Sequence, residues 1–136
     1  MYIFINTSNH KHIFLALINK KGDILISKKI KAEYQQSEKL LLNIEKILLD
    51  SKKKLQDLKG VVCITGPGGF TSLRIGITTA NTIAWVLHIP IIGLEQKENQ
   101  DNLDLIDIGY RKIIKLKKFK QVLPRYGKEP NITIKR

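Results

Sequence analysis

The chain has 136 residues, of which 43% are hydrophobic, and it carries a formal net charge of +12 with a single cysteine. This length suits one globular domain, and no apolar run approaches the roughly 20 residues of a membrane-spanning helix. The lone Cys63 excludes an internal disulfide and no secretory signal is visible, so we expect a cytoplasmic protein.

The first half of the chain predicts three strands and a helix. β-Branched and aromatic runs over residues 2–6, 13–18 and 24–30 are separated by polar turns, which is typical of an antiparallel meander. Ser37 then offers an N-cap, and apolar residues recur at helical spacing through about residue 50. A charged connector follows.

The middle of the chain predicts a strand, a glycine-rich turn, a helix and a further strand. These elements are expected over residues 61–65, 66–69, 70–87 and 89–94, in that order. The predicted order is therefore βββαβαβ in an α/β fold with a mixed sheet. This is the order of one ribonuclease-H-like subdomain, the repeat unit of the actin, hexokinase and Hsp70 superfamily.

The last part of the chain predicts a short β-hairpin and an extended tail. Apolar residues over 105–108 and 113–119 flank Gly109 and Tyr110, which is typical of two strands around a turn. Prolines and a glycine over residues 122–130 indicate an extended tail that lies over the domain.

The glycine-rich turn and the start of its helix resemble a known family. Residues 66–76 read Gly-Pro-Gly-Gly-Phe-Thr-Ser-Leu-Arg-Ile-Gly and are similar to GPGSFTGLRIG, the signature of the TsaB (YeaZ-like) family. The stretch lacks the third glycine of a dinucleotide fingerprint and the lysine of a P-loop. The signature loop comprises Gly66, Pro67, Gly68, Gly69, Phe70 and Thr71.

The resemblance implies a division of the chain near residue 100. Residues 1–100 would form the family's N-terminal ribonuclease-H-like subdomain. Residues 101–136 would be the vestige of a second subdomain, made of the hairpin and the tail. Residues 106–108 and 124–126 are weak relics of two family landmarks, so the resemblance implies a minimal, C-terminally truncated member.

The resemblance also implies a protein that performs no chemistry itself. The related transferase subunit TsaD carries a His-x-x-x-His metal pair, which aligns with Gln96 and Gln100, and amides are poor ligands for transition metals. Asn6 stands where related nucleotide-binding folds carry an aspartate at the end of the first strand. We therefore expect no metal, no cofactor and no catalytic residues.

The helix expected over residues 70–87 is apolar nearly all round, which predicts burial on two sides. One side fits the chain's own sheet, and the other fits either the first helix or a helix of another protein. TsaB proteins pair with TsaD through these two helices, so the resemblance favours a partner. The predicted partner-binding residues are Leu40, Leu41, Ile44, Leu48, Leu73, Arg74, Ile77, Ala80 and Ala84.

The leading hypothesis from the resemblance is a non-catalytic scaffold that binds and stabilises a TsaD-like subunit. The complex would form N6-threonylcarbamoyladenosine at position 37 of tRNAs that read ANN codons. A TsaE-like ATPase is a further expected partner, and the isolated chain could form a homodimer.

Two alternatives remain open at the level of sequence. A small basic RNA-binding module would contact tRNA through Arg111, Lys115, Lys117 and Lys118, because clustered basic residues release counterions from phosphate backbones. A nucleotide-binding enzyme of the same fold would hold its ligand at residues 66–69.

Overall fold

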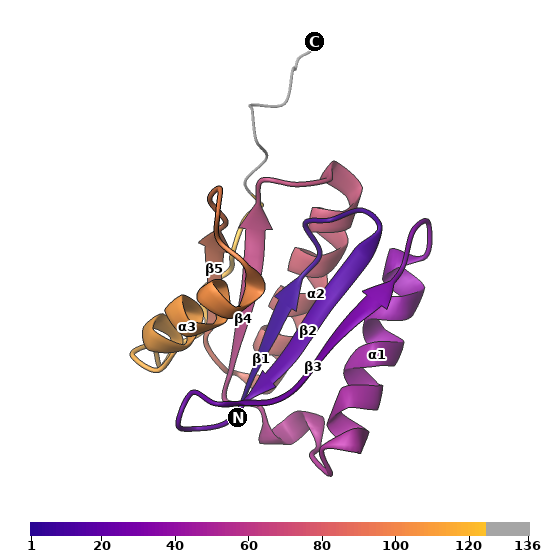
Figure 1. The fold of residues 1–136 in the computed structure, drawn as a ribbon. Coiled ribbons are helices and arrows are strands. Elements are labelled where there is room, and N and C mark those ends of the chain that lie inside the picture. The colour runs from indigo at the N-terminus through magenta and orange to yellow at the C-terminus, as the bar shows by residue number, and fades with distance from the viewer. Residues whose placement is uncertain (125–136) are drawn as a thin grey trace.

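A computed structural model describes residues 1–124 and shows a five-stranded sheet with helices on both faces (Figure 1). Within these residues, no helix combines the length and the hydropathy needed to cross a bilayer. The order of the elements as far as β5 confirms the predicted βββαβαβ, with one additional short 3-10 helix, η1. In chain order the elements are β1 (Tyr2–Asn6), β2 (His12–Ile18), β3 (Ile24–Lys31), α1 (Gln36–Asp50), η1 (Leu55–Asp57), β4 (Gly60–Gly66), α2 (Phe70–Leu87), β5 (Ile91–Glu95) and α3 (Asn102–Ile113).

The sheet is mixed, as predicted, with the strand order β3-β2-β1-β4-β5. β2 pairs antiparallel with both β1 and β3, whereas β1, β4 and β5 run parallel to one another. The carboxyl ends of the three parallel strands therefore meet at one end of the sheet. In open α/β sheets, this is the end at which ligands bind.

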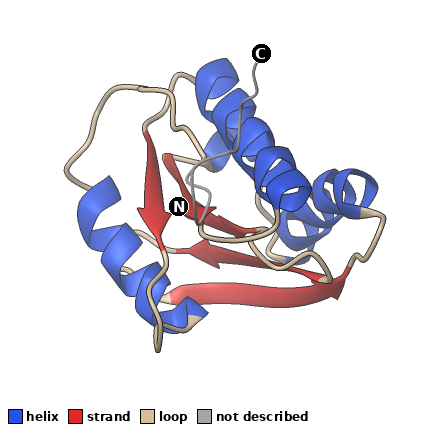
Figure 2. Cartoon of the chain, turned by 90° about the horizontal axis from the view of Figure 1, so that it is seen from above, coloured by secondary structure: helices blue, strands red, loops and turns tan. Residues whose placement is uncertain are grey.

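Alternation along the strands divides the core into two layers. Ile3 and Ile5 of β1 belong to the larger core, which includes buried residues of α1 and α2. Phe4, between them, belongs to a smaller core on the opposite face, which includes Leu105 and Ile106 of α3. Successive side chains of a strand point to opposite faces, so the same strand supports both layers. Helices α1 and α2 therefore cover one face of the sheet and α3 covers the other (Figure 2).

The predicted hairpin over residues 105–119 is wrong, because residues 102–113 form helix α3. Asp101 caps this helix by accepting a hydrogen bond from the Asp104 backbone N–H at 2.9 Å, and the Asp104 carboxylate accepts one from the Asp101 N–H at 3.2 Å. Gly109 brings the helix close to β4, since a Cβ there would lie 2.5 Å from Val62 Cγ1. Capping and close packing on the sheet thus favour helix over strand.

Helix α3 packs on β4 and β5 of the same sheet that carries α1 and α2. The assignment of residues 101–136 to a vestigial second subdomain stays a prediction. Most of the predicted extended tail lies outside the described residues, as does the larger part of the landmark at 124–126.

Helix α1 begins without the N-cap that Ser37 was expected to supply. Its first residue is Gln36, and the preceding Gln35 makes no capping hydrogen bond through its side chain. The Gln36 side chain is buried instead, and its amide donates to the backbone oxygens of Asn9 and His10 at 3.2 and 2.9 Å. This side chain ties the start of α1 to the loop between β1 and β2.

Helix α2 approaches the end of β1 closely at Gly76. A Cβ at Gly76 would overlap the Thr7 side chain, whose hydroxyl donates to the Ser72 backbone oxygen at 2.7 Å. Thr7 and Ser72 are both buried. The contact therefore fixes the rotation of α2 about its axis relative to the sheet.

We expect Gly76→Ala to lower the free energy of unfolding by about 1–3 kcal/mol, because overpacking at Thr7 outweighs the gain in helix propensity. Denaturant unfolding followed by circular dichroism measures the change. The double variant Gly76→Ala/Thr7→Ala should lose less than the sum of the two single variants, because the clashing side-chain atoms are gone. Additive losses, or a stabilised Gly76→Ala variant, would contradict this contact.

Candidate functional site

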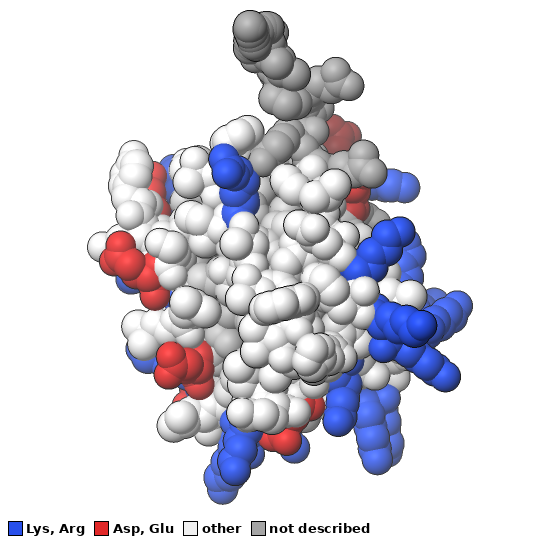
Figure 3. All heavy atoms as spheres, turned by 180° about the vertical axis from the view of Figure 1, so that it is seen from behind, with Lys and Arg blue, Asp and Glu red and all other residues white. Residues whose placement is uncertain are grey.

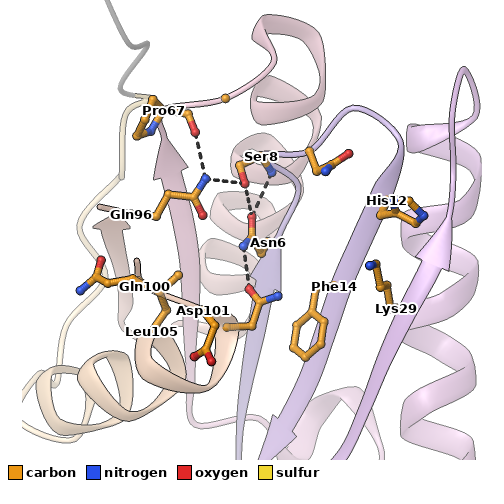
Figure 4. A pocket seen from close by; sticks show the side chains of 13 residues that line it. Asn6, Ser8, His12, Phe14, Lys29, Pro67, Gln96, Gln100, Asp101 and Leu105 are labelled. Carbon is orange, nitrogen blue, oxygen red and sulfur yellow. Dashed lines mark hydrogen bonds between the residues drawn. The ribbon is translucent and has the colours of Figure 1, made fainter. Parts of the chain in front are cut away.

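A cavity of about 520 Å³ opens where β1, β4 and β5 end (Figure 4). Ser8 and Asn6 line it from β1 and the loop after it, while Phe14 and Lys29 line it from the β2–β3 hairpin. The amino-terminal end of α3 closes the remaining side. The cavity thus occupies the ligand-binding end of the sheet.

Asn6 is the centre of a hydrogen-bond network in this cavity. Its amide nitrogen donates to Asn102 Oδ1 at 2.7 Å, and its Oδ1 accepts from both the backbone N–H and the hydroxyl of Ser8, at 3.0 and 2.7 Å. Gln96 donates to the same Ser8 hydroxyl at 2.9 Å. The side chains that follow β1 and β5 are therefore joined to one another and to α3.

The signature loop is held against the chain itself. The Gly69 N–H donates to the Ser8 backbone oxygen at 3.0 Å, and Gln96 donates to the Pro67 oxygen at 3.1 Å. Gly68 lies so close to Ser8 that a Cβ would stand 2.5 Å from its oxygen. A phosphate cradle needs free N–H groups that point at the ligand. The Gly69 N–H is engaged within the protein instead.

The two glutamines predicted to stand at metal-ligand positions both line the cavity. Gln96 is engaged with Ser8 and Pro67, and the Gln100 side chain accepts a hydrogen bond from the Lys97 N–H at 2.8 Å. Within residues 1–124, no group of three His, Cys, Asp or Glu side chains converges on a point. The cavity offers amide and hydroxyl groups together with the Lys29 ammonium and the Asp101 carboxylate, which suit a polar ligand.

Cys63 lies in β4 and is buried in the larger core. Desolvation raises the pKa of its thiol to about 12, so the thiolate is disfavoured at neutral pH.

The structure buries most of the residues predicted to contact a partner. The seven that lie in the larger core are Leu40, Ile44, Leu48, Leu73, Ile77, Ala80 and Ala84. They join α1 and α2 to each other and to the sheet, so an intact domain does not present them to another protein. Leu41, at 56% exposure, and Arg74 are the members of the set that remain accessible.

The outward side of α2 carries a different set of residues. An exposed stripe runs along the helix and consists of Thr71, Arg74, Thr78, Thr82 and Trp85. Its only charged member is Arg74, whose guanidinium lies 5.5 Å from the centroid of the Phe70 ring. Trp85 is 63% exposed, and its neighbour Val86 is 55% exposed. We call these five residues the α2 outer stripe.

A groove of about 420 Å³ lies beside this stripe, between the amino-terminal ends of α1 and α2. Ser37 lines it from α1, and Thr71, Arg74 and Thr78 line it from α2. The face that carries both helices is therefore hollowed where the two helices begin.

The residues predicted to contact RNA are divided between a helix and an irregular segment. Arg111 belongs to α3, where its guanidinium pairs with Asp107 at 3.2 Å. Lys115, Lys117 and Lys118 follow the helix and are exposed. Their contact with RNA stays a prediction.

Two residues at these sites were not predicted from the sequence. Asn102 reaches the cavity because α3 is a helix, and the Asp101 and Asp104 capping pair was the signal that could have indicated it. Trp85 belongs to the exposed side of α2, which apolar spacing does not distinguish from the buried side.

The comparisons with known proteins agree with the family that the signature loop resembles. The family model described as TsaD, tRNA N6-adenosine threonylcarbamoyltransferase, matches residues 28–98. The chain is similar to the tRNA threonylcarbamoyladenosine biosynthesis protein TsaB of Buchnera aphidicola, with 37% identity over 83 residues, which cover 61% of this chain and 39% of that protein. It is also similar to the TsaB protein of Bacillus subtilis, with 35% identity over 95 residues, 69% of this chain and 40% of that one.

A solved structure named YeaZ, from Pseudomonas aeruginosa, shares the fold with a TM-score of 0.64 and 22% identity. The likeness covers 69% of this chain and 43% of that one. The match thus spans about two fifths of the length of these relatives.

We expect excess ATP and magnesium to raise the melting temperature by less than about 1 °C, because the amides around Asn6 are engaged with one another. A nucleotide present at 100 times its Kd would add about 2.7 kcal/mol to the free energy of unfolding, which corresponds to roughly 10 °C. Thermal unfolding with and without the ligands measures the difference. A magnesium-dependent rise of several degrees would instead support the nucleotide-binding alternative.

Proposed function

The chain belongs to the TsaB (YeaZ-like) branch of the family that the TsaD model describes, and from this premise we propose that it is a scaffold subunit in tRNA threonylcarbamoyladenosine biosynthesis. It would bind a TsaD-like subunit in the cytoplasm and leave the transfer of the threonylcarbamoyl group to that partner.

The observation that carries the proposal is the α2 outer stripe. A solvent-facing helix surface of a soluble domain normally carries charged side chains. Here, one cation stands among four uncharged residues, and the stripe ends at a largely exposed tryptophan. Interfaces between proteins are depleted of charge at their centre and enriched in tryptophan and arginine. The stripe has this composition.

Helix α1 also carries exposed apolar side chains, which lie at separate positions along the helix. Leu41, Leu42 and Leu49 are 56%, 50% and 76% exposed. These leucines are buried neither by the sheet nor by α2, so they are available to a partner. Both helices that family resemblance assigns to the interface therefore carry accessible apolar side chains.

The cavity supports a non-catalytic role for this chain. Asn6, Gln96 and Ser8 satisfy one another, and Asn6 provides an amide where a carboxylate would hold a magnesium phosphate. A network of this kind holds β1, the signature loop and β5 together. In this role, the signature loop sets the position of α2 against the sheet.

The partner is inferred from the relatives. TsaB proteins are named for the pathway, and the family model that matches residues 28–98 is that of the transferase TsaD. Two chains of one fold can pair through equivalent helices, so a TsaD-like subunit fits the α2 outer stripe. A TsaE-like ATPase would join the assembled pair, and a second copy of this chain could cover the stripe when the partner is absent.

We expect Trp85→Glu to weaken binding to the TsaD-like protein from the same source more than tenfold, or by at least about 1.4 kcal/mol. The carboxylate would be desolvated at the centre of the interface, where a tryptophan is often a dominant contact. Analytical ultracentrifugation or interferometry on the purified proteins measures the affinity.

Leu103→Glu provides the matched control, because Leu103 is a helical residue of α3 with 60% exposure, close to the 63% of Trp85. This variant should bind like the unaltered chain. The proposal fails if the unaltered chain does not bind the TsaD-like protein, or if both variants bind it equally well.

A further inference from the structure

The positive charge of this protein is concentrated at one end of the chain. Residues 1–110 contain 14 basic and 11 acidic residues, a net charge of only +3. The remaining +9 of the total +12 lies in residues 111–136. A general excess of lysine would spread along the chain, so this distribution indicates a local basic surface.

The described part of this region is anchored to the fold. Residues 114–124, which we call the strap, follow α3 without regular secondary structure. Phe119 and Val122 of the strap pack against the larger core, on the face opposite to α3. The strap therefore crosses from one face of the sheet to the other past β5, the strand at the edge (Figure 1).

Helix α2 fixes the far end of the strap by a pair of hydrogen bonds. Asn81 donates to the Val122 backbone oxygen at 2.8 Å and accepts from the Val122 N–H at 2.9 Å. Val122 also covers Gly93 of β5, where a Cβ would lie 2.5 Å from Val122 Cγ1. The backbone that carries the basic residues between α3 and this anchor is consequently held at both ends.

The lysines of the strap are exposed, and no carboxylate in the described part of the chain forms an ion pair with them. Lys115, Lys117, Lys118 and Lys120 all face solvent. Within residues 1–124, the acidic and basic side chains whose oxygen and nitrogen atoms approach within 4.0 Å are those of Asp107 and Arg111, in α3. The strap thus presents four lysines within the six residues 115–120.

Figure 3 shows how this charge is arranged on the face that carries α1 and α2. Lysines and arginines gather along the flank on which β5 lies, whereas the middle of the face carries no charged side chains. Two surfaces of different chemistry therefore adjoin. An uncharged helix face and a basic flank suit two different partners.

We propose that the strap binds the phosphate backbone of folded RNA through Lys115, Lys117, Lys118 and Lys120. Each lysine that meets a phosphate releases condensed counterions, so binding is driven by charge and falls steeply with salt. The choice of RNA among polyanions rests on the proposed function, because a scaffold in a tRNA-modifying assembly works beside tRNA. Anchoring by Asn81 and Val122 holds the backbone that carries the lysines, which lowers the ordering cost at the time of binding.

The test is a titration of a fluorescein-labelled, unmodified tRNA transcript with the full chain alone, at several KCl concentrations, followed by anisotropy. The triple variant K115Q/K117Q/K118Q should bind at least tenfold more weakly at low salt. It should also lower the slope of log K against log salt by about two to three, because each phosphate contact contributes about 0.7–0.9. Circular dichroism establishes that the variant is folded.

The matched control is K52Q/K53Q/K54Q, which removes three exposed lysines and changes the net charge equally. Its affinity should change less than threefold. Equal weakening by the two triple variants would overturn the proposal, because it would show diffuse attraction to total charge. An absence of tRNA binding, or tighter binding to phosphatidylglycerol vesicles with the same dependence on the strap lysines, would also overturn it.

A second variant tests the anchoring. Asn81→Ala keeps every lysine and removes both hydrogen bonds to Val122, so it should weaken tRNA binding several-fold. Unchanged affinity would overturn the claim that the strap is a positioned surface. Because no partner protein is present, a failure of either experiment is distinguishable from a failure of the TsaD-like subunit to bind the α2 outer stripe.

Discussion

The close contact between α2 and the end of β1 determines which side of α2 this protein exposes. Gly76 lets the helix approach Thr7, and the Thr7 hydroxyl bonds to the Ser72 backbone oxygen in a buried setting. This contact turns Leu73, Ile77 and the alanines of α2 toward the sheet. The opposite side of the helix, which is almost uncharged, is consequently left to solvent or to a partner.

The cavity at the carboxyl ends of the parallel strands shows how a ligand-binding end can serve a structural purpose. Asn6, Ser8 and Gln96 are joined by hydrogen bonds shorter than or equal to 3.0 Å, and Gly69 donates to the backbone of Ser8. Asn6 is buried, and a buried polar group is costly unless it is paired; here the partly buried Ser8 and Gln96 complete the network. The same network joins the signature loop, at the start of α2, to the ends of β1 and β5.

Much of this fold could be predicted from the sequence, because apolar and polar residues alternate along the strands and the signature loop has a specific sequence. The hairpin prediction failed because the apolar residues of α3 also allow alternation, and the Asp101 and Asp104 capping pair was overlooked. The burial of most of the predicted partner-binding residues was missed for a different reason. Helical spacing shows that Leu73 and Ile77 share a face, but only the packing of α2 on β1 shows that this face is internal. Likewise, the anchoring of the strap by Asn81 has no sequence signal.

In the proposed assembly, a TsaD-like subunit covers the outward side of α2. Trp85 is the only tryptophan of the chain, so 5-fluorotryptophan gives a single ¹⁹F resonance that reports on this surface. Adding the unlabelled TsaD-like protein from the same source should shift and broaden that resonance and reduce its sensitivity to a soluble paramagnetic quencher. An unchanged resonance in a mixture that forms a complex by mass would place the interface elsewhere and contradict the account.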